Sequence, residues 1–105
     1  KDVHVSESVQ RYILNIVTLT RGHSSIYLGV SPRGSIALMK TAKAYAYINQ
    51  RHYVLPDDVK FLAPFVLSHR IILTSEATYE GLTNEQVIDS VVQNTYIPVR
   101  KGLTE

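Results

Sequence analysis

The sequence predicts a mainly helical domain, a bundle of four or five helices with room for one minimal β pairing. Three observations support this fold class. Hydrophobic residues make up 45% of the 105 residues and charged residues 19%, a balance typical of one globular domain, residues 1–105. Apolar residues recur at helical spacing in four segments. Serine, threonine, proline and acidic residues stand where those segments begin.

The first predicted helix starts after Ser6 and ends near Arg21. Ser6 is the expected N-cap, because its hydroxyl can accept a hydrogen bond from a free backbone N–H of the first turn. Arg21 followed by Gly22 is typical of a helix C-terminus. The apolar stripe of this helix comprises Val9, Tyr12, Ile13, Ile16 and Val17.

The second predicted helix begins at Ser31-Pro32 and runs to about Asn49. Serine is a common N-cap, and proline suits the first helical position because its missing N–H would have no partner there. Alanine favours a helix and lets a neighbouring helix approach closely. The alanines of this segment are Ala37, Ala42, Ala44 and Ala46.

The third predicted helix starts at Pro56, and Asp57 and Asp58 suit the positive end of its dipole. Adjacent residues of a helix point in different directions, so these two acids are not expected to act as a catalytic pair. Pro64 lacks the N–H that would bond the carbonyl of Lys60, which predicts a kink. The apolar positions of this helix are Val59, Leu62, Val66 and Leu67.

The fourth predicted helix opens with Thr83 and Gln86 at the spacing of a capping box. Three β-prone segments lie between the helices, at 26–28, 53–55 and 71–73, and one or two of them could pair. The tail, 96–105, is predicted to be extended.

Arg33 is the most informative residue for function, because it occupies the first turn of the second helix. A helix N-terminus carries about half a positive charge, so a cation there is normally disfavoured. A bound anion would remove the conflict, since backbone N–H groups and the guanidinium could face one phosphate together. Gly34 and Ser35 add little bulk beside it, so a ligand could come near. The alternative is an exposed arginine pointing into water, where solvent screens the penalty.

Four stretches of the chain resemble the lid domain of MoxR-family AAA+ ATPases. They are Tyr12-Ile13 with Thr20-Arg21, LGVSPR at 28–33, RHYVLPDDV at 51–59 and VLSHRI at 66–71. Each is weak alone, but together they cover nearly the whole chain in family-like order and spacing. The resemblance implies a helical fold of the AAA+ lid type. It also implies that the chain is a fragment of a longer ATPase whose nucleotide-binding core is absent.

The resemblance further implies site residues and partners. Arg33 matches the sensor-2 arginine that reaches the γ-phosphate, within the segment Ser31, Pro32, Arg33 and Gly34. The first lid helix borders the adenine in such proteins, which makes Tyr12, Ile13 and Ile16 candidates, although ordinary core positions are the more common role for such residues. The expected partners are the N-terminal AAA+ core of the same protein, which would hold ATP and Mg, and neighbouring protomers of a hexameric ring. The expected role is chaperone-like remodelling or maturation of a client protein.

Two departures from the family pattern concern the fold. Leu55 stands where similar lids often have a capping threonine, so the third helix lacks a hydroxyl cap. Gln50 stands where a glycine is common, so the turn after the second helix is expected to differ.

Several kinds of active site have no counterpart in the sequence. No glycine-rich phosphate loop ending in Lys-Ser or Lys-Thr occurs, so the fragment alone is expected neither to hydrolyse ATP nor to hold a cofactor. The four histidines lack metal-ligand spacing, so no metal site is expected. His69 and Arg70 are expected to interact with the C-terminus of the third helix, with a domain-contact role for Arg70 as the alternative.

Two other classes of function remain open from the sequence. An alanine-rich helix, a short loop and Pro-Asp-Asp-Val are also reminiscent of histone folds, but the net charge of +2 without a basic stripe argues against a nucleic-acid partner. A protein-interaction domain without a nucleotide role is the other interpretation. No apolar run approaches the roughly 20 residues of a membrane span, so a cytoplasmic protein without a membrane partner is expected.

Overall fold

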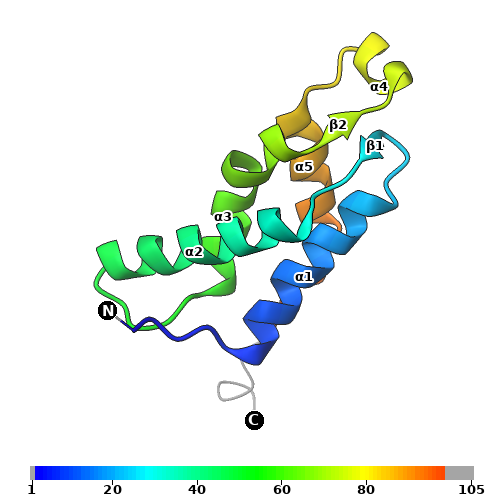
Figure 1. Ribbon diagram of the computed structural model, residues 1–105. Coiled ribbons are helices and arrows are strands. Elements are labelled where there is room, and N and C mark those ends of the chain that lie inside the picture. The colour runs from blue at the N-terminus through cyan, green and yellow to red at the C-terminus, as the bar shows by residue number, and fades with distance from the viewer. Residues whose placement is uncertain (1, 99–105) are drawn as a thin grey trace.

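The computed structural model describes residues 2–98 and confirms the mainly helical prediction (Figure 1). Five α-helices and one two-stranded antiparallel sheet make up the fold of these residues. In chain order the elements are α1 (Glu7–Arg21), β1 (Ile26–Leu28), α2 (Pro32–Ile48), α3 (Pro56–Leu67), the 3₁₀ turn η1 (Ser68–Arg70), β2 (Ile72–Leu73), α4 (Ser75–Tyr79) and α5 (Asn84–Gln93).

Helix α1 has the predicted boundaries and buried face. The Ser6 hydroxyl accepts a hydrogen bond from the Val9 N–H at 3.2 Å, and Gly22 follows the last helical residue. Every residue of the predicted stripe is buried, namely Val9, Tyr12, Ile13, Ile16 and Val17. The core therefore lies between α1 and the helices that pack on it, α2, α3 and α5.

Helix α2 ends in a Schellman motif, in which two backbone bonds close the last turn. The Arg51 N–H donates to the Ala46 carbonyl at 2.9 Å, and the Gln50 N–H donates to the Tyr47 carbonyl at 2.9 Å. Gln50 has φ of +63°, the left-handed conformation that favours glycine. A non-glycine residue therefore adopts a geometry that favours glycine, so the turn expected to differ because of Gln50 keeps a glycine-type conformation.

Replacing Gln50 by glycine is expected to raise the free energy of unfolding by about 0.5–1 kcal/mol, because glycine adopts positive φ without steric strain. Urea unfolding followed by circular dichroism at 222 nm measures this difference. Gln50→Ala is the matched control, since it removes the same side chain without relieving the backbone. Equal stability of the two variants would contradict the interpretation.

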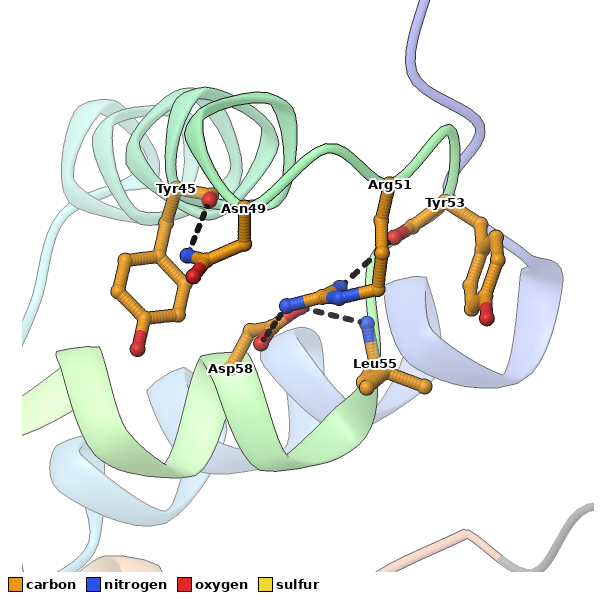
Figure 2. Close-up of polar contacts among 6 residues, drawn as sticks. All are labelled: Tyr45, Asn49, Arg51, Tyr53, Leu55 and Asp58. Carbon is orange, nitrogen blue, oxygen red and sulfur yellow. Dashed lines mark hydrogen bonds and ion pairs between the residues drawn. The ribbon is translucent and has the colours of Figure 1, made fainter.

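An ion pair closes the corner between α2 and α3 (Figure 2). The two terminal nitrogens of Arg51 donate to the two Asp58 carboxylate oxygens at 2.8 and 2.7 Å. Asp58 is only 4% exposed, and its carboxylate also accepts the Leu55 N–H at 2.8 Å. Hydrogen bonding to the Asp58 carboxylate raises the pKa of Arg51 above its ordinary value. Asp58 thus bonds to the backbone N–H of the N-cap residue Leu55, while no described side chain caps the first turn of α3, as the leucine at position 55 predicts. Besides suiting the helix dipole, as predicted, Asp58 holds the corner before α3.

Helix α3 continues past Pro64 to Leu67, so the proline does not end the helix. On its outer face Phe61 and Phe65 are 54% and 66% exposed. The ring of Phe61 lies 5.8 Å from that of Tyr45 on α2 and 5.6 Å from that of Phe65, measured between centroids. These three side chains form an aromatic surface across α2 and α3.

The predicted β pairing joins β1 to β2, with Ile26 opposite Leu73 and Leu28 opposite Ile72. The β-prone segment at 53–55 forms no strand, and a single bridge links Tyr53 to His4. The ladder lies at one end of the fold, beside α4 (Figure 1). It fixes the segment that leads into α2.

Helix α5 confirms the predicted capping box. The Gln86 N–H donates to the Thr83 hydroxyl at 3.1 Å, and the Thr83 N–H donates to the Gln86 side chain at 3.0 Å. The tail, 96–105, was predicted to be extended: residues 96–98 have no regular structure, and 99–105 lie outside the described residues.

Candidate functional site

Arg33 lies in the first turn of α2, as predicted, and is exposed. Within residues 2–98 neither of the two ion pairs involves it, since these join Arg11 to Glu7 and Arg51 to Asp58. The first turn of α2 contains no acidic residue. The cation therefore stands at the positive end of the helix with no described carboxylate to compensate it.

Ser31 occupies the N-cap position with an extended backbone, but its hydroxyl makes no capping hydrogen bond. The prediction that this serine caps the helix through its side chain was therefore wrong. The Ser31 carbonyl instead accepts the Gly34 N–H at 2.9 Å. The Ser35 hydroxyl bonds back to the Pro32 carbonyl at 2.7 Å. Because Pro32 has no N–H and the Gly34 N–H is already bonded, the Arg33 N–H is the one backbone donor of the first three residues of α2 that has no described partner and could meet an anion.

Two residues at the end of α1 hold the loop before α2. The Thr20 hydroxyl, which is buried, donates to the Val17 carbonyl at 2.6 Å and accepts the Val30 N–H at 3.0 Å. The Arg21 Nε donates to the Val30 carbonyl at 2.9 Å. Both peptide groups of Val30 are thus fixed to α1, which sets the position from which Arg33 projects. Sequence reasoning missed this role, and the only signal was a threonine at the end of an otherwise apolar stripe.

Gly34 allows the first turn of α2 to pack directly on its surroundings. A Cβ at this position would clash with Val30 Cγ1 and lie 3.3 Å from Arg70 Cδ, and Gly34 itself is buried. The small residue was predicted to leave room for a ligand, but that room is filled by Val30 and Arg70. A contact between Gly34 and a nucleotide stays a prediction.

A groove of about 380 Å³ runs between α1 and α2 beside the start of α2. Ile36 is three residues after Arg33, so the two share a face of the helix. Leu14 of α1 and Ile36 also line the groove and are 57% and 54% exposed. The lining residues are Glu7, Gln10, Arg11, Ile13, Leu14, Ser35, Ile36 and Met39.

Comparison with known proteins identifies this arrangement. The family model described as the AAA lid domain matches residues 18–91. The Mycobacterium tuberculosis protein named chaperone MoxR1 is 32% identical over 90% of the chain, and the Paracoccus denitrificans protein MoxR is 33% identical over 68% of it. The chain is a lid domain of the MoxR family of AAA+ ATPases.

The lid domain spans a third or less of the relatives that it matches. The Bacillus subtilis protein YeaC is 48% identical over 97% of this chain, which corresponds to 32% of YeaC. The matches to MoxR1 and to the Paracoccus protein cover 27% and 25% of those proteins. A solved structure from Cytophaga hutchinsonii, described as a candidate ATPase, superposes with a TM-score of 0.87 at 39% identity, covering 93% of this chain and 32% of that one.

The three adenine candidates of the lid domain belong to its core. Tyr12, Ile13 and Ile16 are 1%, 2% and 0% exposed. Burial, and then the charge of Asp57, raise the pKa of Tyr12 above its ordinary value. Of the three only Ile13 is among the residues that line the groove beside α2. Their contact with adenine stays a prediction.

The described part of the lid domain has neither a cluster of metal ligands nor a membrane-spanning helix. No three His, Cys, Asp or Glu side chains of residues 2–98 come together as metal ligands. None of the described helices combines the length and apolar character that crossing a membrane requires.

Proposed function

We propose that residues 1–105 form one domain, the C-terminal lid of a MoxR-type AAA+ ATPase, and that Arg33 is its sensor-2 arginine, reaching the γ-phosphate of ATP. The observation that carries this proposal is the exposed guanidinium in the first turn of α2, with no described acidic partner. A phosphate placed there would meet the positive end of the helix and a charge-assisted hydrogen-bond donor together. An arginine at a phosphoryl centre stabilises the charge that develops during transfer. Ser31 and Pro32 set the backbone of this turn.

The core of the full-length protein would supply the remaining parts of the site. ATP and Mg would bind mainly to that core, because the lid has no glycine-rich phosphate loop. The protein would work in the cytoplasm as a hexameric ring, in which the lid contacts its own core and a neighbouring protomer. The name of MoxR1, a chaperone, supports a role in remodelling or maturing client proteins. Neither a nucleic acid nor a membrane is proposed as a partner.

The full-length protein is expected to hydrolyse ATP in the presence of Mg²⁺, whereas residues 1–105 alone should not, because the phosphate loop lies outside the lid. Phosphate release measured for both proteins at equal concentration checks this. Hydrolysis by the isolated lid, or none by the full-length protein, would contradict the proposal. A DNA-binding titration of the lid in moderate salt tests the histone-like alternative, and tight, salt-dependent binding would favour that alternative.

A further inference from the structure

Positive charge is segregated in the lid in a way that net charge does not reveal. No aspartate or glutamate occurs at 8–56 or at 59–75. These two segments contain α2, η1, both strands and nearly all of α1. Three arginines in them, Arg21, Arg33 and Arg70, surround the turn that starts α2, and none forms an ion pair with a described residue. The start of α2 is therefore a site of uncompensated positive charge.

Arg70 reaches this turn from the other half of the sequence. It is the last residue of η1, and its Cδ would lie 3.3 Å from a Cβ at Gly34, the neighbour of Arg33. The β ladder sets this juxtaposition, because Leu28 lies opposite Ile72. Arg70 is two residues before Ile72, and Arg33 is five residues after Leu28. The pairing thus brings both arginines to the same end of α2.

The hydrogen-bonding capacity of Arg70 is unused. Its Nε is buried and has no hydrogen-bond partner among residues 2–98. None of the hydrogen bonds described for these residues involves its terminal nitrogens, and neither of those nitrogens is among the buried unpaired atoms. A guanidinium carries five N–H donors, and leaving a buried donor unpaired is unfavourable. Packing against Gly34 would need only the aliphatic part of the Arg70 side chain. The unused donors of the guanidinium therefore suggest an acceptor outside the lid.

We propose that Arg70 is a second phosphate-binding arginine, whose terminal nitrogens contact the polyphosphate of the nucleotide that Arg33 reaches. This inference rests on the proposed function of the lid. A triphosphate offers oxygens on adjacent phosphorus atoms, so two guanidinium groups can bind it side by side. The same anion would compensate the positive charge of both arginines. Arg21 remains bonded to the Val30 carbonyl and holds the loop before α2 in place.

Arg70→Met in the full-length protein tests the inference, because methionine retains a flexible apolar stem against Gly34 and removes the guanidinium. The loss of a charge-assisted contact is expected to raise the KM for ATP and the Kd of a fluorescent ATP analogue about 10- to 100-fold. Arg70→Lys keeps the charge but loses the planar, two-pronged arrangement of N–H donors. Its KM and Kd should lie between those of the wild type and those of Arg70→Met. Lys60→Met, which removes an exposed cation of α3, is the matched control and should leave both constants unchanged.

The variants separate this inference from the proposed function. If Arg70→Met keeps the wild-type KM and Kd while Arg33→Ala slows turnover, the inference is wrong and the sensor-2 assignment stands. If both variants match the wild type, both proposals fail. If Arg70→Met loses thermal stability, Arg70→Lys decides, because a packing role predicts full ATP affinity from lysine and a forked phosphate contact predicts weakened affinity.

Discussion

Asp58→Ala is expected to lower the free energy of unfolding by about 3 kcal/mol, because it removes both carboxylate acceptors of a partly buried guanidinium and the acceptor of a backbone N–H. Of its described hydrogen bonds, the guanidinium keeps only the one to the Tyr53 carbonyl. The Arg51 side chain is 21% exposed, so water recovers part of the loss and the lower end of the usual range for broken ion pairs applies. The Leu55 N–H loses its bond of 2.8 Å at the same time. Chemical denaturation of residues 1–105 at pH 7 measures the difference.

Asp57→Ala is the matched control for this prediction. Asp57 neighbours Asp58 in the first turn of α3 but is exposed, so only its interaction with the helix dipole is lost, about 0.3–1 kcal/mol. If the two substitutions destabilise the protein equally, the ion pair at the corner is not the source of stability. A double-mutant cycle of Arg51→Met and Asp58→Ala measures the coupling energy between the two side chains. The effects of the two substitutions on the free energy of unfolding should be strongly non-additive.

Arg33→Ala is expected to slow ATP hydrolysis by the full-length protein about a hundredfold, the typical effect of removing one donor to developing charge. The fold should be unaffected because the side chain is exposed and makes no described ion pair. Steady-state phosphate release gives kcat and KM, and a thermal melt of the same sample checks the fold.

Lys40→Ala provides the control for this measurement, since it removes an exposed cation from the same helix seven residues further on. Turnover of Arg33→Ala within twofold of the wild type would defeat the sensor-2 assignment. A parallel loss in Lys40→Ala would point to the overall charge of α2 instead of one contact.

Features that depend on residues within one helical turn could be predicted from the sequence. The caps at Ser6 and Thr83 involve partners three residues away, and both were confirmed. The apolar face of α1 follows from its period alone. The same locality explains why the Ser-Pro pair at the helix start is enough to place Arg33 in the first turn of α2.

Features that depend on contacts between distant segments could not be predicted. Helix α4 has five residues, too few to show a period, and its start is marked only by the Thr74 cap. The pairing of Arg51 with Asp58 depends on the left-handed conformation of Gln50, just before Arg51. Arg70 reaches Gly34 only through the β ladder. Ser31 is an exception among the local features: it has the sequence of a cap, yet the Gly34 N–H bonds to its backbone carbonyl and its hydroxyl makes no capping bond.

The bidentate ion pair between Arg51 and Asp58 fixes the orientation of α2 relative to α3. The two helices should therefore move together as one rigid body. The 17 residues of α2 extend about 25 Å, and a rotation of about 10° about its N-terminal end would carry the C-terminal end about 4 Å. The aromatic surface of Tyr45, Phe61 and Phe65 spans both helices. If Arg33 contacts the γ-phosphate as proposed, gain or loss of that phosphate would shift this aromatic surface without any change in conformation inside the lid.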